Sequence, residues 1–273
     1  MTHVRYFSIC SGVGGFELGI EQAAQELGIT TECVGYSEID KAAIRTYEEH
    51  FNHDNYGDTT LIDPNTLPEF DLLVAGFPCP SFSRAGKQLG FADVRGAIIF
   101  DIIRILAARQ PRRFILENVK GLVSHDKGQT LRTILDNLDA VGYQLQWKVL
   151  NSKDYGVPQS RERIYIVGNL GGTPQPEVFR RTGSSNPYST VGLTTETAVA
   201  RTLTAGGNSG GNHSGMTIIR TPQGDRRLTP TEWERLQGFP DGWTVGSDTQ
   251  RYKQCGNAVT VNVVRDVALR LLA

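Results

Sequence analysis

One cysteine stands in a setting that suits a nucleophile. Cys79 lies between Pro78 and Pro80, directly after the apolar run 72–75 and Gly76. Prolines restrict the backbone on both sides, and α/β sheets keep their reactive groups after the carboxyl ends of strands. A cysteine in such a place is reachable and can act as a thiolate. The alternative is a buried structural cysteine, but no hydrophobic stripe is present for it to join.

Charged residues accompany two other apolar runs. Glu117 ends the run 113–117, where burial would raise its pKa and let it hold or share a proton. Arg161 and Arg163 precede a further strand and, two residues apart, point the same way. Guanidinium groups suit phosphate or carbonyl oxygens. A salt bridge for Glu117 and a solvated arginine pair are the alternatives. With Cys79, these residues indicate a thiolate that attacks a pyrimidine ring.

A glycine-rich turn after the first apolar run predicts a nucleotide site. The turn contains Gly12, Gly14 and Gly15, but residue 17 is Glu where a dinucleotide fingerprint has its third glycine. Glu38 follows about 20 residues further on, where a carboxylate accepts hydrogen bonds from ribose hydroxyls. Asp58 is a candidate acceptor for the adenine amine. These features suit an adenosine ligand, and no GxxxxGK[ST] loop supports phosphoryl transfer.

The elements that position these residues alternate between strand and helix. Apolar runs predict strands over 5–10, 31–36, 72–75, 113–117, 144–150 and 163–167. Apolar stripes predict helices over 16–27, 40–51, 98–106 and 131–141, with a last one marked by Val259, Val263, Val267 and Leu271. Repeated strand–helix units predict an α/β fold with a doubly wound, mostly parallel sheet and right-handed crossovers.

The amino-acid composition of the chain changes after Asn169. Residues 171–215 are rich in Gly, Ser, Thr and Pro and carry no helical stripe. Regular order resumes near Leu228, where Thr231 is predicted to cap a helix through Leu236. We therefore expect residues 1–170 plus 253–273 to form the large domain and residues 171–252 to form a small, loop-rich one.

Composition narrows the class of protein. Of the 273 residues, 39% are hydrophobic, and no stretch approaches the ~20 apolar residues of a membrane span. The first residues lack the apolar core of a signal peptide, so we expect a cytoplasmic protein. The four cysteines are Cys10, Cys33, Cys79 and Cys255, and their spacing suggests neither a metal site nor a disulfide framework.

The charge distribution predicts a local rather than a broad polyanion site. A net charge of −1 counts against an extended basic surface. Six arginines nevertheless gather between residues 180 and 227, against Glu196 and Asp225. They are Arg180, Arg181, Arg201, Arg220, Arg226 and Arg227. This patch favours phosphate contacts, with solvated surface arginines as the alternative.

With these motifs in this order, the chain resembles the cytosine carbon-5 DNA methyltransferases of bacterial restriction–modification systems and phages. The matching segments are 7–19, 36–40, 57–58, 76–87, 95–96, 114–121, 150–168, 201–205, 227–241 and 254–261. The resemblance implies a class I S-adenosylmethionine-dependent methyltransferase fold, Rossmann-like, with a small target-recognition domain. It also implies methyl transfer to carbon-5 of a cytosine flipped out of double-stranded DNA.

The same resemblance implies a role for each motif residue. Cys79 would add to carbon-6, Glu117 would hydrogen-bond ring nitrogen 3 and the exocyclic amine, and Arg163 would support the carbonyl oxygen with Arg161 close by. The residues assigned to S-adenosylmethionine are Gly12, Gly14, Phe16, Glu38, Ile39, Asp58, Pro78 and Asn257. The DNA contacts would be Ser83, Arg95, Arg201 and Arg227. The resemblance implies no metal, a monomer, and a restriction endonuclease that acts separately.

Three features depart from the family pattern. Pro80 stands where most relatives carry Gln, and Ser8 stands where an acid usually ends the first strand. The variable region before Arg201 is short, which predicts a short or relaxed target because few bases can be read in the major groove.

Two other functions stay open from the sequence. A transfer-RNA carbon-5 methyltransferase would share this scaffold, and a catalytically silent DNA-binding protein would keep the fold. A nicotinamide oxidoreductase is disfavoured by the broken glycine pattern and the thiol.

Overall fold

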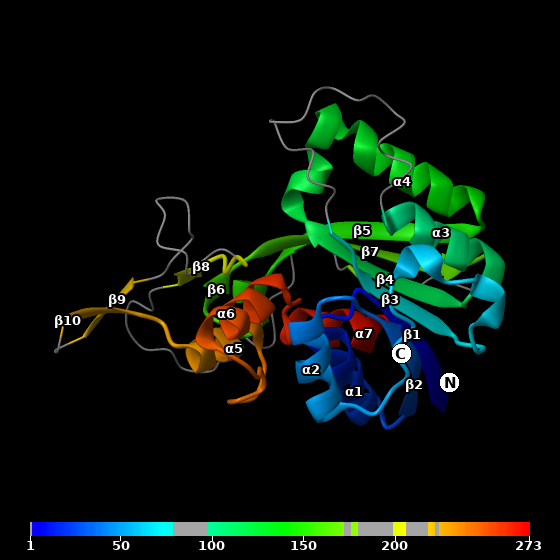
Figure 1. Cartoon of the computed structure of the whole chain (residues 1–273). Coiled ribbons are helices and arrows are strands. Elements are labelled where there is room, and N and C mark those ends of the chain that lie inside the picture. Colours follow the sequence, from blue (N-terminus) through cyan, green and yellow to red (C-terminus); the bar gives the residue numbers. More distant parts are fainter. Residues whose placement is uncertain (1, 79–97, 172–175, 180–198, 206–217, 222–223) are drawn as a thin grey trace.

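A six-stranded sheet forms the centre of the molecule (Figure 1). The computed structural model describes residues 2–78, 98–171, 176–179, 199–205, 218–221 and 224–273. The strand order is β2-β1-β3-β4-β7-β5. The bounds are β1 (His3–Ile9), β2 (Thr30–Ser37), β3 (Leu72–Gly76), β4 (Arg113–Val119), β5 (Tyr143–Asn151) and β7 (Glu162–Leu170). The sheet is mostly parallel, as predicted, but β7 runs antiparallel to both β4 and β5.

Helices cover both faces of this sheet (Figure 1). They are α1 (Gly15–Leu27) and α7 (Val261–Leu272) on one face, and α3 (Ile98–Arg109) and α4 (Gln129–Ala140) on the other. Alternate residues of β3 serve the two faces: Leu73 packs with α3 and α4, and Leu72 packs with α1 and α7. This two-sided burial explains the continuous apolar runs of the sequence.

α2 (Lys41–His50) is capped by Asp40, whose side chain accepts hydrogen bonds from the backbone N–H groups of Ala42 and Ala43. The predicted cap is therefore confirmed. The cap fixes the start of α2 directly after the end of β2, beside the segment that carries Glu38.

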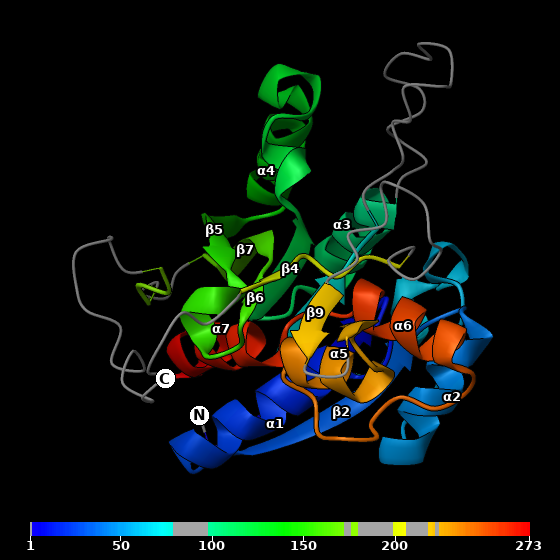
Figure 2. The same cartoon turned by 90° about the vertical axis from the view of Figure 1, so that its left-hand side faces the viewer.

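The described residues outside the large sheet and the helices that cover it form small sheets and further helices. β6 (Gln159–Ser160) pairs with β8 (Ala200–Arg201), and β9 (Ile218–Thr221) pairs with β10 (Gly224–Arg227) in a hairpin that extends away from the body in Figure 1. α5 (Pro230–Gln237) and α6 (Asp248–Asn257) lie side by side, with α6 next to α2 (Figures 1 and 2). The expected domain boundary at residue 252 falls inside α6.

The predicted helix cap at Thr231 is wrong by two residues. Thr229 caps α5: its side chain accepts from the backbone N–H of Glu232, and the Glu232 carboxylate accepts from the backbone N–H of Thr229. Pro230 follows as the first helical residue, where its missing N–H costs nothing.

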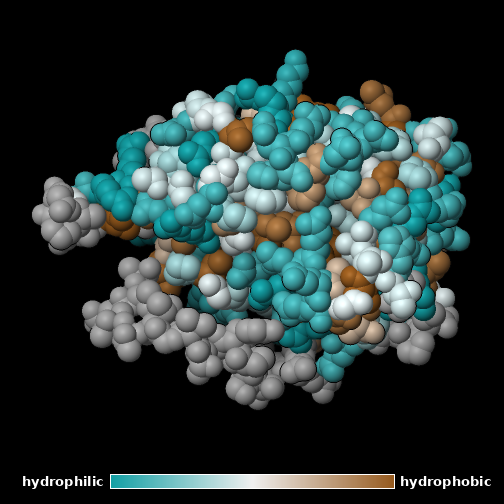
Figure 3. Space-filling view, turned by 90° about the horizontal axis from the view of Figure 1, so that it is seen from below, coloured by the Kyte–Doolittle hydropathy of each residue, from teal (hydrophilic) through white to brown (hydrophobic). Residues whose placement is uncertain are grey.

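The face of the molecule seen in Figure 3 is predominantly hydrophilic, with its hydrophobic residues in small areas, as on other globular proteins. No helix within the described residues is long and apolar enough to cross a membrane. In the same part of the chain, no group of three or more His, Cys, Asp or Glu side chains could hold a metal ion.

Glu17, which breaks the glycine fingerprint, is a fully buried acid in the first turn of α1. The hydroxyl of Tyr47 donates to Glu17 Oε1 at 3.2 Å, whereas Oε2 has no hydrogen-bond partner among the described residues. Burial raises the pKa of Glu17 from 4.5 to about 7, and the nearby hydroxyls of Ser8 and Tyr47 oppose the rise. The folded protein therefore binds a proton at Glu17 more tightly than the unfolded chain does.

This raised pKa predicts a pH-dependent stability difference between the wild type and Glu17→Gln. A group whose pKa is higher in the folded state stabilises fully below its unfolded pKa and loses that contribution as the pH rises through its folded pKa. Between pH 4.5 and 8 the wild type should therefore lose up to about 3 kcal/mol relative to Glu17→Gln. Urea unfolding at several pH values measures the difference. Glu48→Gln, at an exposed position of α2, is the matched control, and parallel profiles for the wild type and Glu17→Gln would contradict the expectation.

Candidate active site

The carboxyl ends of β1, β3 and β4 enclose a cavity of about 380 Å³ together with α6. This volume lies in the range of small-molecule sites. The cavity brings predicted residues from both ends of the site to one place: Gly12, Glu38, Ile39, Pro78, Glu117, Arg161, Arg163 and Asn257 line it. The predicted adenosine residues and the predicted reactive residues thus share one continuous space.

Glu117 is the buried acid of this cavity. It is 7% exposed, and the register of β3 and β4 pairs it with Gly76. Arg163 Nε lies 3.2 Å from Glu117 Oε1, an ion pair without good hydrogen-bond geometry. Burial raises the pKa of Glu117, and the charges of Arg163 and Arg161 oppose the rise without cancelling it. The carboxyl therefore keeps a proton at higher pH than an exposed glutamate does.

The chain that leads into Cys79 lies against Glu117. Asn118 Nδ2 donates to the Phe77 carbonyl at 3.0 Å, which ties this segment to the end of β4. A Cβ added at Gly76 would lie 3.7 Å from Glu117 Oε2, so the backbone passes close to the carboxyl. Pro78 then lines the cavity. Cys79, Pro80, Ser83 and Arg95 lie outside the described residues, so their assignments stay predictions.

Arg161 and Arg163 make different contacts. Arg163 faces Glu117, and its Nη1 donates to the Glu162 carbonyl at 2.8 Å. Arg161 is 3% exposed, and its guanidinium donates to three carbonyl oxygens, that of Leu203 at 2.9 Å and, at the end of α6, those of Gly256 and Ala258 at 3.3 and 2.8 Å. Burial lowers the pKa of Arg161 to about 10, so it stays charged near neutrality. Its contacts favour a positioning role over the predicted contact with the nucleotide.

The other end of the cavity is built around the Glu38 carboxylate. Its Oε2 accepts from the Gly12 N–H at 2.8 Å, and its Oε1 accepts from the N–H groups of Ile39 and Asp40 at 2.8 and 2.9 Å. The Ile39 side chain is 66% exposed, although it is large and apolar. A Cβ added at Gly12 would meet nothing within 4 Å, so the turn faces open space. A carboxylate, an exposed apolar side chain and accessible backbone fit an adenosine with free ribose hydroxyls.

Three of the predicted cofactor residues make their contacts with other parts of the fold. Phe16 is buried, 3.4 Å from a Cβ added at Gly76. Gly14 packs against Phe51. Asp58 Oδ1 accepts from the backbone N–H and the hydroxyl of Thr60 at 2.9 and 2.8 Å. None of the three is among the residues that line the cavity.

One arginine of the predicted basic patch is held in an ion pair. Arg201 and Arg227 are exposed on the strands β8 and β10. Arg226, however, is held by the Glu232 carboxylate through two contacts of 2.8 Å. This ion pair lowers the pKa of Glu232 to about 2 and offsets one charge of the patch.

Of the polar residues that α6 presents to the cavity, the sequence predicted Asn257 but not Gln250, Lys253 or Gln254. Gln250, Lys253, Gln254 and Asn257 line the cavity, and Lys253 Nζ lies 2.6 Å from Asp40 Oδ2. The spacing of these residues, at i, i+3, i+4 and i+7, places them on one side of a helix and is visible in the sequence.

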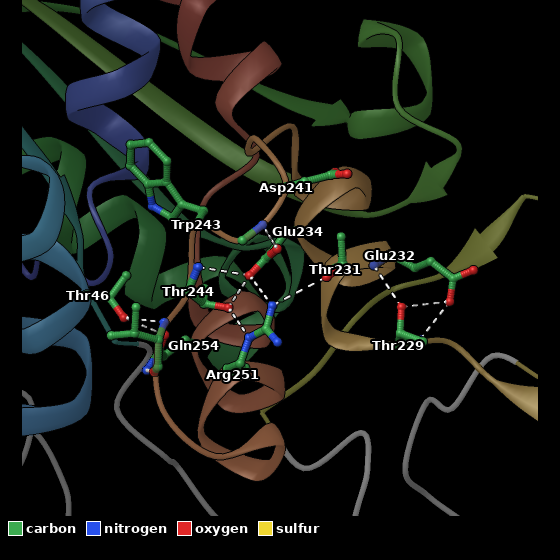
Figure 4. A network of polar contacts seen from close by, with 12 residues as sticks. Thr46, Thr229, Thr231, Glu232, Glu234, Asp241, Trp243, Thr244, Arg251 and Gln254 are labelled. Carbon is green, nitrogen blue, oxygen red and sulfur yellow. Dashed lines mark hydrogen bonds and ion pairs between the residues drawn. The ribbon is translucent and has the colours of Figure 1, made fainter.

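A buried polar network holds α6 in place (Figure 4). Glu234 of α5 is fully buried and accepts from the backbone N–H of Thr244 and from Arg251 Nη2 at 2.8 and 2.9 Å. Thr46 of α2 donates its hydroxyl to Gln254 Oε1 at 2.9 Å. Because α6 is fixed to both α5 and α2, its polar face is directed at the cavity.

Known proteins are similar to this chain along nearly its whole length. The family model of the C-5 cytosine-specific DNA methylases matches residues 4–183 and 174–273. The chain is 38% identical over 307 aligned residues to the type II methyltransferase M.NlaX of Neisseria lactamica, covering 98% of this chain and 96% of that protein. It is 35% identical over 309 aligned residues to the type II methyltransferase M1.ScrFI of Lactococcus lactis subsp. cremoris, covering 98% and 78%.

A solved structure shares the whole fold. The Dnmt2 methyltransferase of S. pombe superposes with a TM-score of 0.78 at 18% identity and covers 98% of both chains. The predicted family, fold and enzyme class are thereby confirmed. The chain belongs to the C-5 cytosine-specific DNA methylases.

Proposed function

We propose that this protein transfers a methyl group from S-adenosylmethionine to carbon-5 of a cytosine in double-stranded DNA, with Cys79 as the nucleophile. The observation that carries the proposal is the single cavity with Glu38 at one end and the Glu117–Arg163 pair at the other. Pro78 lines the same cavity and directly precedes Cys79. A thiolate arriving there would meet a base already held by an acid and an arginine.

Different residues hold the cofactor, attack the base and protonate it. S-adenosylmethionine would supply an electrophilic methyl group, and Glu38, Ile39 and Asn257 would hold it. The Cys79 thiolate adds to carbon-6 and forms an Sγ–carbon bond, while negative charge develops over carbon-5 and ring nitrogen 3. Glu117, with its raised pKa, gives its proton to nitrogen 3 and so stabilises that charge.

Arg163 orients the base, and the steps after methyl transfer restore the site. Its guanidinium beside Glu117 is suited to the cytosine carbonyl oxygen. Once carbon-5 is methylated, a water-mediated base removes the carbon-5 proton, the Sγ–carbon bond breaks, and Cys79 leaves as a thiolate. Nitrogen 3 returns its proton to Glu117, which restores the starting state.

The DNA partner follows from the chemistry of the target. A cytosine ring is inaccessible inside a duplex, so the nucleotide has to leave the stack at a cost of a few kcal/mol. Ser83, Arg95, Arg201 and Arg227 would contact phosphates, and residues 171–252 would read a short target. We expect the enzyme to act as a monomer in the bacterial cytoplasm, where its DNA lies, beside a restriction endonuclease that works separately.

Methyl transfer from tritiated S-adenosylmethionine to duplex DNA and to transfer RNA tests the proposal. We expect label in duplex DNA, and bisulfite sequencing of plasmid from expressing cells should then show a short methylated site. Label in transfer RNA alone would move the function to the RNA enzyme. Label in neither substrate, despite cofactor binding, would favour the catalytically silent protein.

A further inference from the structure

Trp243 reaches the glycine turn from a distant part of the sequence. It lies between α5 and α6, and its indole Nε1–H donates to the Val13 carbonyl at 2.8 Å. Val13 is 1% exposed and Trp243 is 8% exposed, so this hydrogen bond is buried. In Figure 4 the indole points toward α1, the helix that follows the glycine turn.

The orientation of the indole is itself fixed. The Trp243 ring stacks on His50 with centroids 3.6 Å apart and an interplanar angle of 11°. His50 Nε2 lies 2.8 Å from the Trp243 carbonyl oxygen, so ring and backbone are held by the same side chain. Phe239 stacks with centroids 5.4 Å away. The indole N–H is therefore aimed at Val13 by contacts that do not involve the cavity.

The glycine turn is clamped between two hydrogen bonds. On the cavity side, the Gly12 N–H donates to Glu38, which lines the predicted adenosine end. On the outer side, Val13 accepts from Trp243. The turn also has little spare space, because a Cβ at Gly14 would lie 2.4 Å from Phe51 and one at Gly15 would lie 2.8 Å from Val259. Trp243 and Glu38 thus both hold the glycine turn at the cavity.

We propose that Trp243 is a positioning residue for the cofactor, which acts through the Val13 carbonyl to hold the glycine turn in its binding conformation. This inference rests on the proposed function, since it takes the cavity as the S-adenosylmethionine site. It makes the segment between α5 and α6 part of the cofactor site, although this segment does not line the cavity.

Trp243→Phe tests the role because it keeps an aromatic ring and removes the N–H donor. A buried carbonyl left without a donor no longer fixes the turn. We expect the Kd for S-adenosylmethionine, measured by calorimetry on the full chain, to rise about tenfold. The KM for the cofactor should rise with it, and kcat at saturating cofactor should stay within about twofold.

Trp233→Phe is the matched control. Trp233 lies in α5, is 3% exposed and packs on Tyr252 in a separate apolar cluster. The Trp233→Phe variant should bind the cofactor with an unchanged Kd, even if its Tm is lower. A merely structural role for Trp243 would instead lower Tm and the active fraction in both variants alike and leave the cofactor KM unchanged.

A measurement on the wild type does not depend on whether Trp243→Phe folds. Indole-¹⁵N labelling gives one N–H resonance for each of Trp147, Trp233 and Trp243, and Trp147→Phe and Trp233→Phe assign them by elimination. S-adenosylhomocysteine should shift the Trp243 resonance and slow its hydrogen exchange, with the Trp233 resonance unchanged. An unmoved Trp243 resonance, or a wild-type Kd in Trp243→Phe, overturns the inference. Failure of the wild type to bind the cofactor at all would instead overturn the proposed function.

Discussion

Glu117→Gln is expected to slow methyl transfer by about two to four orders of magnitude, the usual contribution of a positioned acid–base group. Gln fits the same space and can still donate a hydrogen bond, but it cannot pass a proton to ring nitrogen 3. The burial that raises the pKa of Glu117 is what keeps this proton available. Single-turnover rates at saturating DNA and cofactor isolate the chemical step from binding.

The rate of methyl transfer should also depend on pH, and the direction follows from the protonation state of Glu117. Because the protonated carboxyl is the active form, the wild-type rate should fall as the pH rises past the raised pKa of Glu117, whereas Glu117→Gln should lack this limb. Glu162→Gln is the matched control, since Glu162 is a neighbouring glutamate that pairs with Lys120 at 2.8 Å. A Glu117→Gln rate close to that of the wild type, with cofactor affinity intact, would move the acid–base role to another group.

The sequence predicted well what depends on local pattern. The apolar run of β3 and the run that ends at Glu117 are buried on both faces, and the carboxyl ends of neighbouring parallel strands meet at one edge. That is enough to bring Gly76, Pro78 and Glu117 together. The cap at Thr229 could also have been predicted from the sequence, because Thr229 and Glu232 have the spacing of a capping box and Pro230 occupies the first helical position.

The remaining features depend on contacts between distant segments. No local pattern shows that β7 inserts antiparallel between β4 and β5, because strand order is set by pairing across the chain. Arg161 and Arg163 are both arginines two residues apart, yet Arg161 donates its hydrogen bonds to three buried carbonyl oxygens. The partners of Glu17 and Trp243 lie 30 and 230 residues away, so neither role can be read from spacing.

Cys79→Ser is expected to abolish turnover while S-adenosylmethionine binding persists. A serine hydroxyl is un-ionised near neutral pH and is a far weaker nucleophile than a thiolate, so the bond to carbon-6 does not form. The residues proposed to hold the cofactor, Glu38 and Ile39, are untouched by the change. Cys33→Ser, at a cysteine buried among Tyr6 and Tyr47 away from the cavity, is the matched control and should retain activity.

A duplex with 5-fluorocytosine at the target makes the nucleophile directly visible. The fluorine replaces the carbon-5 proton, and a base cannot remove it, so the Sγ–carbon bond persists after methylation. The wild type and Cys33→Ser should give a protein–DNA adduct that survives a denaturing gel, and Cys79→Ser should give none. An adduct or undiminished methylation in Cys79→Ser would assign the attack to another group. Because Asn118 ties Phe77 to the strand that carries Glu117, loss at Cys79 should remove the nucleophile and leave the acid in place.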